Sequence, residues 1–454
     1  MPNIFLRRES NVRSYCRRFS KEFFSASGAT LTDTSGNTYI DFLAGCSSLN
    51  YGHNDPDMKA ALISYIQSDG IAHGLDLHTA AKLEFLTCLE KNILTRRTLD
   101  HKVMFTGPTG TNAVEAALKI ARKATGRTNV IAFTNAFHGV TVGAVAATGN
   151  RLHRNGANYP LSGGTRIPFD GYVEGVKSAA LLRRMLQDKA SGVDAPAAIL
   201  LEIVQAEGGL NVASKKWLND IAAVSQDFGA LLIIDDIQCG CGRAGTFFSF
   251  EGTGIIPDIV TMAKSISGFG LPMALLMVRP QYDVLAPAEH NGTFRGNTHA
   301  FVTAKIAIEK FWSCTAFEKT IELKSRILHN GLQKIETIVP NSRLKGLSMI
   351  QGIDVGSAKL ADEIVHSAFQ QGLIIETSGP EDQVVKVLAP LTIEENLLLQ
   401  GLDILLYATE QAMKSQDPSP KNKIHRDSIS DNCSSTSSFS TSQTSLNKNT
   451  GEFP

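Results

Sequence analysis

Between residues 100 and 280, short apolar runs alternate with segments of helical spacing, and this alternation constrains the fold more than any other feature of the chain. Such an alternation is typical of parallel strands joined by crossover helices, and it predicts an α/β sheet buried on both faces. A helix is expected at residues 113–124. Strands are expected at residues 102–105, 130–133, 197–202, 230–235, 259–263 and 275–278.

The flanking segments have different patterns. Residues 28–42 alternate polar and apolar side chains around a turn, which predicts a two-stranded antiparallel ribbon. Residues 300–338 have helical spacing and lead into a smaller α+β segment. We expect a small domain from residues 1–55 and 301–413, a large domain from residues 56–300, and a disordered Ser/Thr-rich tail at residues 414–454.

Composition narrows the classes of partner. Lys plus Arg equal Asp plus Glu at 44 each with no cationic block, which argues against nucleic acid and anionic membranes and favours small polar substrates. The 7 cysteines are scattered and form no C-x-x-C pair, so neither a disulfide framework nor a zinc site is expected. The sequence contains no signal-peptide core or membrane-length apolar run, so we expect a cytoplasmic protein without a metal.

Lys264 stands in DIVTMAKSISGFGLPMA, directly after an apolar strand and before a glycine-bearing loop. A lysine in such a place can be partly desolvated, which makes its amine nucleophilic. A lone lysine at a strand end is more often simply solvated. A nucleophilic role for Lys264 therefore depends on features at the ends of other strands.

One such feature is GPTGTNAVEAALK, where Gly110 and Thr111 follow a strand and open a helix. Free backbone N–H groups there favour an anion, although an ordinary glycine turn with a threonine cap is the simpler alternative. Another is ALLIIDDIQ, in which strand alternation puts Asp235 and Ile237 on one face and Gln238 on the other. Asp235 and Asp236 could instead bind magnesium, but no second carboxylate cluster in the sequence supports such a site.

Phe137 in NAFHG provides a flat wall that could stack on an aromatic ring, with Ile237 on the opposite side. A core phenylalanine is the plainer interpretation, and His138 is expected in a supporting, hydrogen-bonded role. A lysine, an anion pocket, a carboxylate and a flat wall are together what pyridoxal 5'-phosphate (PLP) requires. Lys264 would hold its aldehyde carbon, and Asp235 would keep its ring nitrogen protonated.

The loop GCGRAG matches the dinucleotide pattern G-x-G-x-x-G through Gly240, Gly242 and Gly245. A dinucleotide-binding turn passes directly from strand into helix, whereas here DDIQC intervenes and TFFSF follows. A nicotinamide-dependent dehydrogenase is therefore only a third hypothesis, and Cys239 and Cys241 are expected to be buried thiols.

In this order, and to about Met413, these motifs resemble the class III aminotransferases of PLP fold type I. The resemblance implies a large domain with a mostly parallel seven-stranded sheet, a smaller α+β domain and at least a homodimer. Within the class, GPTGTNAVEAALKIAR, FHGVTVGAVAATGN, DDIQCGCGR, EHNGTFRGN and LIIETSGPEDQVVKVLAPLTI resemble the diaminobutyrate aminotransferases of ectoine biosynthesis. That similarity implies transfer of an amino group from L-glutamate to L-aspartate 4-semialdehyde, giving L-2,4-diaminobutyrate and 2-oxoglutarate.

The resemblance also implies roles for single residues. Gly110 and Thr111 would bind phosphate, Phe137 and Ile237 would sandwich the ring, and Gln238 would approach its phenolic oxygen. Thr293 matches a position that reaches the phosphate of the neighbouring subunit. Glu207 matches a glutamate that pairs with a C-terminal arginine.

The sequence departs from the wider class at Lys386, where an arginine is expected, and at Ile203, where a proline is expected. Lysine offers a point charge rather than a bidentate fork, so we expect either Lys386 or Arg295 to bind a substrate carboxylate. Another class III enzyme with a different amine, an aminomutase or racemase, and a non-catalytic protein on the same fold are the remaining alternatives.

Overall fold

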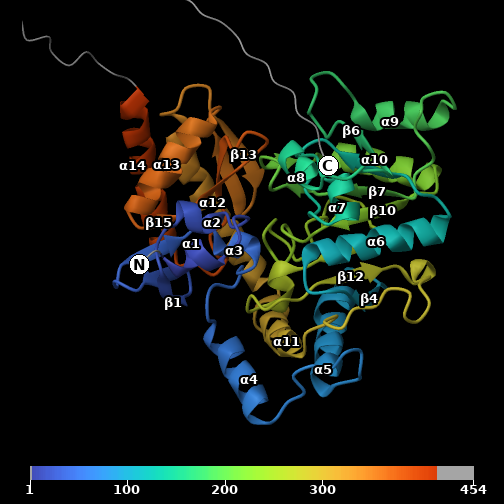
Figure 1. Ribbon diagram of the computed structural model, residues 1–454, viewed down its shortest axis with the longest axis horizontal. Coiled ribbons are helices and arrows are strands. Elements are labelled where there is room, and N and C mark those ends of the chain that lie inside the picture. Colours follow the sequence, from blue (N-terminus) through green and yellow to red (C-terminus); the bar gives the residue numbers. More distant parts are fainter. Residues whose placement is uncertain (1–2, 417–454) are drawn as a thin grey trace, which may run out of the picture. The chain divides into compact units, whose positions relative to one another are not determined.

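A seven-stranded sheet organises the larger part of the chain in the computed structural model, which describes residues 3–416 (Figure 1). Its strand order is β4-β12-β11-β10-β7-β5-β6. The strands are Lys102–Phe105 (β4), Val130–Phe133 (β5), Gly164–Ile167 (β6), Ala198–Leu201 (β7), Leu231–Asp235 (β10), Ile259–Met262 (β11) and Leu275–Val278 (β12). The predicted α/β fold with a mostly parallel seven-stranded sheet is confirmed.

Two features of this sheet differ from the expected strand pattern. Strand β12 runs antiparallel to both β11 and β4, whereas the other neighbours in the sheet are parallel. Strand β6 was not expected, because its sequence GTRI contains a single large apolar residue. It lies at the sheet edge and only Ile167 in it is buried, so it lacks the apolar run of the central strands.

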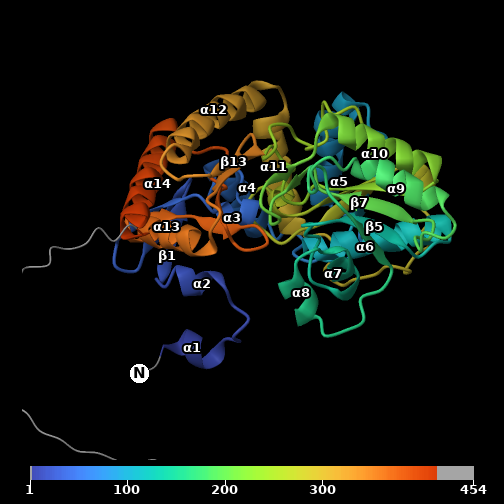
Figure 2. The same ribbon diagram turned by 90° about the horizontal axis from the view of Figure 1, so that it is seen from above.

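Helices cover both faces of the sheet (Figure 2). Helices α6 (Gly110–Thr125) and α7 (Val142–Ala147) lie on one face, and α9 (Ser178–Gln187) and α10 (Lys215–Asp227) lie on the other. Helix α6 begins three residues before the expected helix at 113, because Thr109 precedes it as a cap and its N–H donates to Asn112 Oδ1 at 3.3 Å. This early start brings Gly110 and Thr111 into the first turn.

The N-terminal and C-terminal segments share a second sheet of four strands, β1-β2-β3-β15. The expected ribbon at 28–42 is its centre, formed by β2 (Thr30–Asp33) and β3 (Thr38–Asp41), while β1 (Phe23–Ser27) and β15 (Leu373–Ile374) complete it. Because β15 pairs in parallel with β3, residues far apart in the chain lie side by side (Figure 1).

A third sheet, β13-β14-β17-β16, belongs to the C-terminal part and carries residues of the site described below. Its strands are Arg343–Leu347 (β13), Ile350–Asp354 (β14), Glu376–Ser378 (β16) and Val384–Val387 (β17). Helices α12 (Ala316–Glu336), α13 (Ala358–Gln370) and α14 (Glu395–Gln416) belong to the same part of the chain. The helical spacing at 300–338 corresponds to two helices, α11 (Thr298–Trp312) and α12, rather than one.

Helices α4 (Pro56–Gln67) and α5 (Ala80–Leu89) pack against α11. No helix within residues 3–416 is long and apolar enough to cross a membrane. Of the tail expected at 414–454, the first three residues end α14, and residues 417–454 lie outside the described residues.

Candidate active site

A cavity of about 320 Å³ lies where several strands of the seven-stranded sheet end. Parallel strands bring their carboxyl ends to one edge of a sheet, and the turns that follow them can therefore meet. The expected residues that line this cavity are Gly110, Thr111, Phe137, His138, Asp235, Ile237, Gln238 and Lys264. Residues from four separate turns are thus brought together around one space.

Lys264 follows β11 and begins a short 3₁₀ turn. Its backbone φ is 55°, in the left-handed region that residues with a side chain rarely adopt. Strained conformations of this kind persist where the surrounding structure holds them, and they are frequent at functional sites. The side chain lines the cavity, as the position after an apolar strand predicts.

Asp235 ends β10 and is held in place by three neighbours. Its Oδ2 lies 2.7 Å from His138 Nδ1, and its Oδ1 accepts hydrogen bonds from Thr261 Oγ1 at 3.2 Å and from the Ile237 N–H at 3.3 Å. Both Asp235 and His138 are buried. His138 therefore fixes the orientation of the carboxylate, in the supporting position that the sequence suggests.

The expected anion pocket lies at the first turn of α6. Its N–H groups have no partner within the helix, so they can bind an anion. A Cβ atom at Gly110 would come within 2.9 Å of Ile237 Cδ1, so a side chain there would push against the wall of the cavity. Thr111 Oγ1 lies 2.6 Å from Thr141 Oγ1, which adds a second hydroxyl beside the pocket.

Glu202 holds the backbone of Phe137, one of the two expected ring walls. Its Oε2 accepts a hydrogen bond from the Phe137 N–H at 3.0 Å. Burial, reinforced by the charge of Asp235, raises the pKa of Glu202 well above its ordinary value. A buried, hydrogen-bonded carboxyl group therefore fixes the backbone that carries the expected ring wall.

Gln238 lines the same cavity as Asp235, although strand alternation predicts opposite faces. Strand β10 ends at Asp235, and the following residues turn, so the alternation stops there. Gln238 Nε2 donates a hydrogen bond to Glu207 Oε1 at 3.1 Å. Gln238 thereby links the cavity to a group of charged residues next to it.

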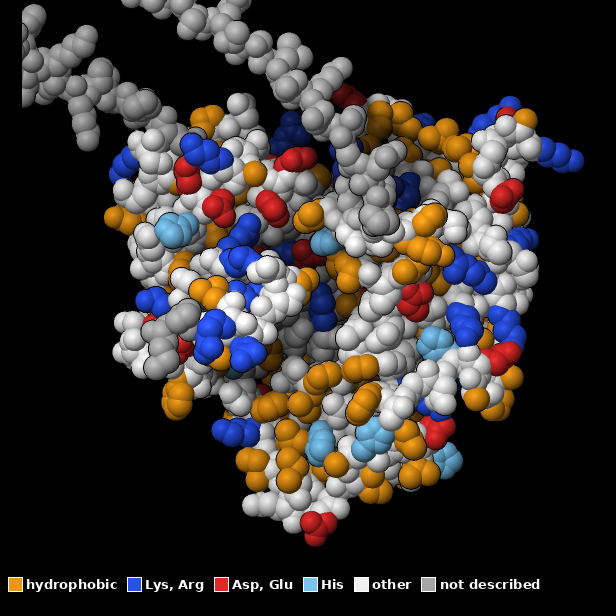
Figure 3. Space-filling model, viewed as in Figure 1, with side chains coloured by type: hydrophobic (Ala, Val, Ile, Leu, Met, Phe, Trp, Pro, Cys, Tyr) orange, Lys and Arg blue, Asp and Glu red, His pale blue; other side chains and the backbone are white. Residues whose placement is uncertain are grey.

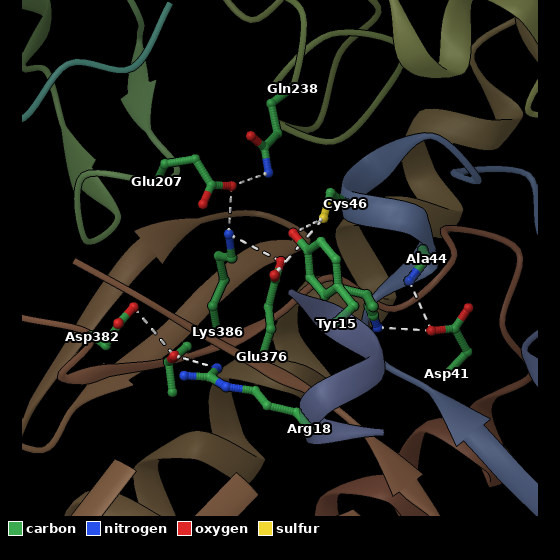
Figure 4. A network of polar contacts seen from close by, with 12 residues as sticks. Tyr15, Arg18, Asp41, Ala44, Cys46, Glu207, Gln238, Glu376, Asp382 and Lys386 are labelled. Atoms are coloured by element: carbon green, nitrogen blue, oxygen red, sulfur yellow. Dashed lines mark hydrogen bonds and ion pairs between the residues drawn. The ribbon is translucent and has the colours of Figure 1, made fainter. Parts of the chain in front are cut away.

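That group centres on Lys386, whose side chain is 0% exposed (Figure 4). Lys386 Nζ lies 2.8 Å from Glu207 Oε1 and 3.1 Å from Glu376 Oε1. Although burial opposes charge, Lys386 and Lys264 lower the pKa of Glu207 to about 2, while the two glutamates raise the pKa of Lys386. Burial raises the pKa of Glu376. The expected pairing partner of Glu207 is thus present as a lysine shared by two carboxylates.

Two expected residues lie neither in the lining of this cavity nor in the charged group beside it. Arg295 borders a separate cavity beside α5 and forms an ion pair with Asp76. Thr293 is exposed on the same loop. Of the two candidates for binding a substrate carboxylate, the structure places only Lys386 next to the active-site cavity of its own chain.

Comparisons with known proteins agree with this architecture. Residues 18–408 match the family described as aminotransferase class III. A diaminobutyrate--2-oxoglutarate transaminase from Vibrio parahaemolyticus is 53% identical over 410 residues, which cover 90% of this chain and 97% of that protein. A protein of the same name from Halomonas elongata is 51% identical over 415 residues, covering 90% of this chain and 99% of the relative.

Solved structures show the same fold at lower identity. An S-selective transaminase from Bacillus megaterium has a TM-score of 0.80 at 20% identity, covering 91% of this chain and 98% of the other. An ornithine aminotransferase from Toxoplasma gondii has a TM-score of 0.77 at 23% identity, covering 91% and 94%. Because the family match spans most of the described residues, the chain belongs to the class III aminotransferases, which are PLP-dependent enzymes.

Proposed function

We propose that this enzyme moves an amino group from L-glutamate to L-aspartate 4-semialdehyde, giving L-2,4-diaminobutyrate and 2-oxoglutarate in the cytoplasm, as the first step of ectoine biosynthesis. The chemistry is supported by one observation above all, that Lys264, Asp235 and the first turn of α6 border the same cavity. The choice of substrates is supported by relatives that share about half of their residues with the chain over nine-tenths of its length.

The residues around the cavity fit PLP. The first turn of α6 offers N–H groups for a phosphate, and the bare Gly110 leaves room beside Ile237. Phe137 and Ile237 border the cavity as walls for a ring, and the buried Asp235 carboxylate offers an acceptor for a protonated ring nitrogen. Lys264 offers the amine that the aldehyde of the cofactor needs.

When bound, PLP would supply an aldehyde carbon that accepts the amino group of the substrate and a ring that takes up the electrons left on the substrate carbon. Lys264 Nζ would hold the cofactor at rest and, once released, would move a proton from the substrate carbon. Asp235 Oδ2 would hold the proton of the ring nitrogen, with His138 keeping the carboxylate in place. Gln238 and Glu207 form the polar edge of the cavity on the side of Lys386.

We further propose that two copies of the chain associate through the surface of α4, α5 and the loop of Thr293. Figure 3 shows apolar side chains gathered over α4 and α5, and Ile66 and Leu83 are among the exposed ones. The Phe294 ring lies 5.3 Å from the His73 ring, so the loop that carries Thr293 packs beside this surface. A partner's cavity could receive Thr293 there. Light scattering of the purified protein tests the proposal, and a monomer at working concentration contradicts it.

The proposed reaction is tested by incubating the purified, PLP-loaded protein with glutamate and aspartate 4-semialdehyde. We expect 2,4-diaminobutyrate and 2-oxoglutarate in equal amounts by mass spectrometry. Product formed only with other aldehydes from a panel would show a different class III enzyme. Isomerised semialdehyde without 2-oxoglutarate would show an aminomutase.

A further inference from the structure

A second cavity, also of about 320 Å³, adjoins the first on the side of Lys386. Phe137 lines both cavities, and Glu207, which borders the second, receives a hydrogen bond from Gln238 of the first. The second cavity is also lined by Arg18 and Glu376. A substrate bound beside Lys264 in the first cavity can therefore extend its far end toward Arg18 and Glu376 in the second.

Glu376 and Glu207 together place two carboxylates around a single cation. Lys386 is the cation, and the Glu376 side chain is only 5% exposed. The other oxygen of Glu376, Oε2, lies 3.8 Å from the Cys46 thiol, a weak donor (Figure 4). The cluster has one negative charge more than it has positive charges. Burial raises the pKa of the Glu376 carboxyl group, so a second cation beside it would be stabilising.

Arg18 provides a positive charge in the lining of the same cavity as Glu376. Its Nη1 donates a hydrogen bond of 2.6 Å to Thr377 Oγ1, and Thr377 follows Glu376 in β16. Within residues 3–416, the carboxylate nearest to the guanidinium is Asp362, 3.8 Å from Nε. The Arg18 side chain is 33% exposed, so it retains donors that can face a ligand in the cavity. The lining of the second cavity thus contains Arg18 as a cation and, with Glu207 and Asp382, the carboxyl group of Glu376.

The two proposed substrates share a covalent spacing that fits this arrangement. In glutamate, the carboxylate at C5 is three bonds from the reacting carbon C2. In diaminobutyrate and aspartate 4-semialdehyde, the carboxylate at C1 is likewise three bonds from the reacting carbon C4. The second pair carries an ammonium group on C2, directly beside that far carboxylate, and lacks the carboxylate that glutamate bears on its reacting carbon.

We infer that Arg18 binds the far carboxylate of both substrates. We infer that Glu376 binds the C2 ammonium group of diaminobutyrate and aspartate 4-semialdehyde, which has no counterpart beside the far carboxylate of glutamate. The inference rests on the proposed function and names the residues that choose its substrates. An arginine fork suits a carboxylate, and a buried carboxylate suits an ammonium group. Glu376 would then select the amino-acid end of the acceptor, while Arg18 would allow glutamate to use the same site.

Three amine donors separate the two contacts. Relative to diaminobutyrate, 4-aminobutyrate lacks only the ammonium group on C2, and 1,3-diaminopropane lacks only the carboxylate. Each donor is tested as a substrate, with 2-oxoglutarate as the amino acceptor, or as a competitive inhibitor. The enzymes compared are the wild type, Glu376→Gln and Arg18→Gln. Glu381→Gln and Arg17→Gln, at exposed positions of the same charge, are the matched controls.

We expect Glu376→Gln to lower kcat/KM for diaminobutyrate by about 10- to 100-fold while changing the value for 4-aminobutyrate much less, because one charged hydrogen bond is lost. Arg18→Gln should lower kcat/KM for diaminobutyrate, 4-aminobutyrate and glutamate and spare 1,3-diaminopropane. The controls should behave as the wild type.

The readout is the ratio between donors, because a merely structural defect would lower all of them equally. Equal losses for every donor, or unchanged ratios in both variants, would overturn the inference. If Glu376→Gln does not fold, the Arg18→Gln comparison still decides the carboxylate contact, and the inhibition constant of 4-aminobutyrate relative to diaminobutyrate in Glu376→Asp decides the ammonium contact. A wild type that cannot use diaminobutyrate at all would instead refute the proposed function.

Discussion

The two adjoining cavities differ in how the chain builds them. The first is made from turns directly after strands of one sheet, each with a short motif around Gly110, Phe137, Asp235 or Lys264. The second combines the N-terminal segment, residues that follow β5 and β7 of the large sheet, and strand β16 with the residues after it. Reaction chemistry thus belongs to local motifs, whereas substrate choice depends on contacts between distant segments.

The largest expected effect lies in the first cavity. Lys264→Ala removes both the amine that holds the cofactor and the group that moves the proton, so turnover should fall by at least about 10³-fold. Steady-state assays check the loss. Exposed Lys319 offers a matched control, since Lys319→Ala should retain full activity. Near-normal turnover in Lys264→Ala would contradict the proposal that Lys264 holds the cofactor and moves the proton.

Asp235→Asn should have the next largest effect. The amide keeps the shape but cannot hold a proton on the ring nitrogen, so kcat should fall by about 10²- to 10³-fold, as for the loss of one electrostatic contact in an active site. The measurement is kcat with saturating PLP, together with cofactor affinity by fluorescence. A fall confined to cofactor affinity would show that Asp235 only binds.

Beside the second cavity, Lys386→Met should lower the free energy of unfolding. The change leaves the buried Glu376 and the partly exposed Glu207 carboxylates without their shared cation, which should cost about 3–5 kcal/mol of unfolding free energy. Urea unfolding measures this, with Lys386→Arg as the variant that keeps the charge. Equal stability of Lys386→Met and the wild type would show that the cluster is not held by this cation.

A smaller effect should appear with pH. The pKa of Glu207 is lowered to about 2 from an ordinary value of 4.5, so its ionised form stabilises the fold. This contribution is fully present above pH 4.5 and is lost as the pH falls toward 2. The stability difference between wild type and Glu207→Gln should therefore shrink over this interval. A difference independent of pH would contradict the ion pair with Lys386.

The sequence predicts the first cavity well because each residue there follows a recognisable strand. The end of an apolar run locates Lys264 and Asp235, and a glycine-threonine turn before a helix locates the anion pocket. Local pattern failed where its signal was weak. Strand β6 has one large apolar residue, and β12 has the same composition as its parallel neighbours although it runs antiparallel.

The second cavity could not be predicted in the same way. Glu207 and Lys386 were suggested by family resemblance, but Arg18 and Glu376 have no local motif. Their proximity depends on the pairing of β15 with β3, which brings the N-terminal segment beside the C-terminal one. Nothing in the spacing of either segment specifies that pairing, because its partner lies more than three hundred residues away. Arg18 itself links the two segments through its hydrogen bond to Thr377 and its ion pair with Asp362.

The most direct test of the account is to locate the covalent bond between the enzyme and its cofactor. The purified holoenzyme is reduced with borohydride, digested and sequenced by mass spectrometry. The account predicts a phosphopyridoxyl group on the peptide that contains Lys264. Labelling of a different lysine, or no labelled peptide from a protein that retains PLP, would contradict it.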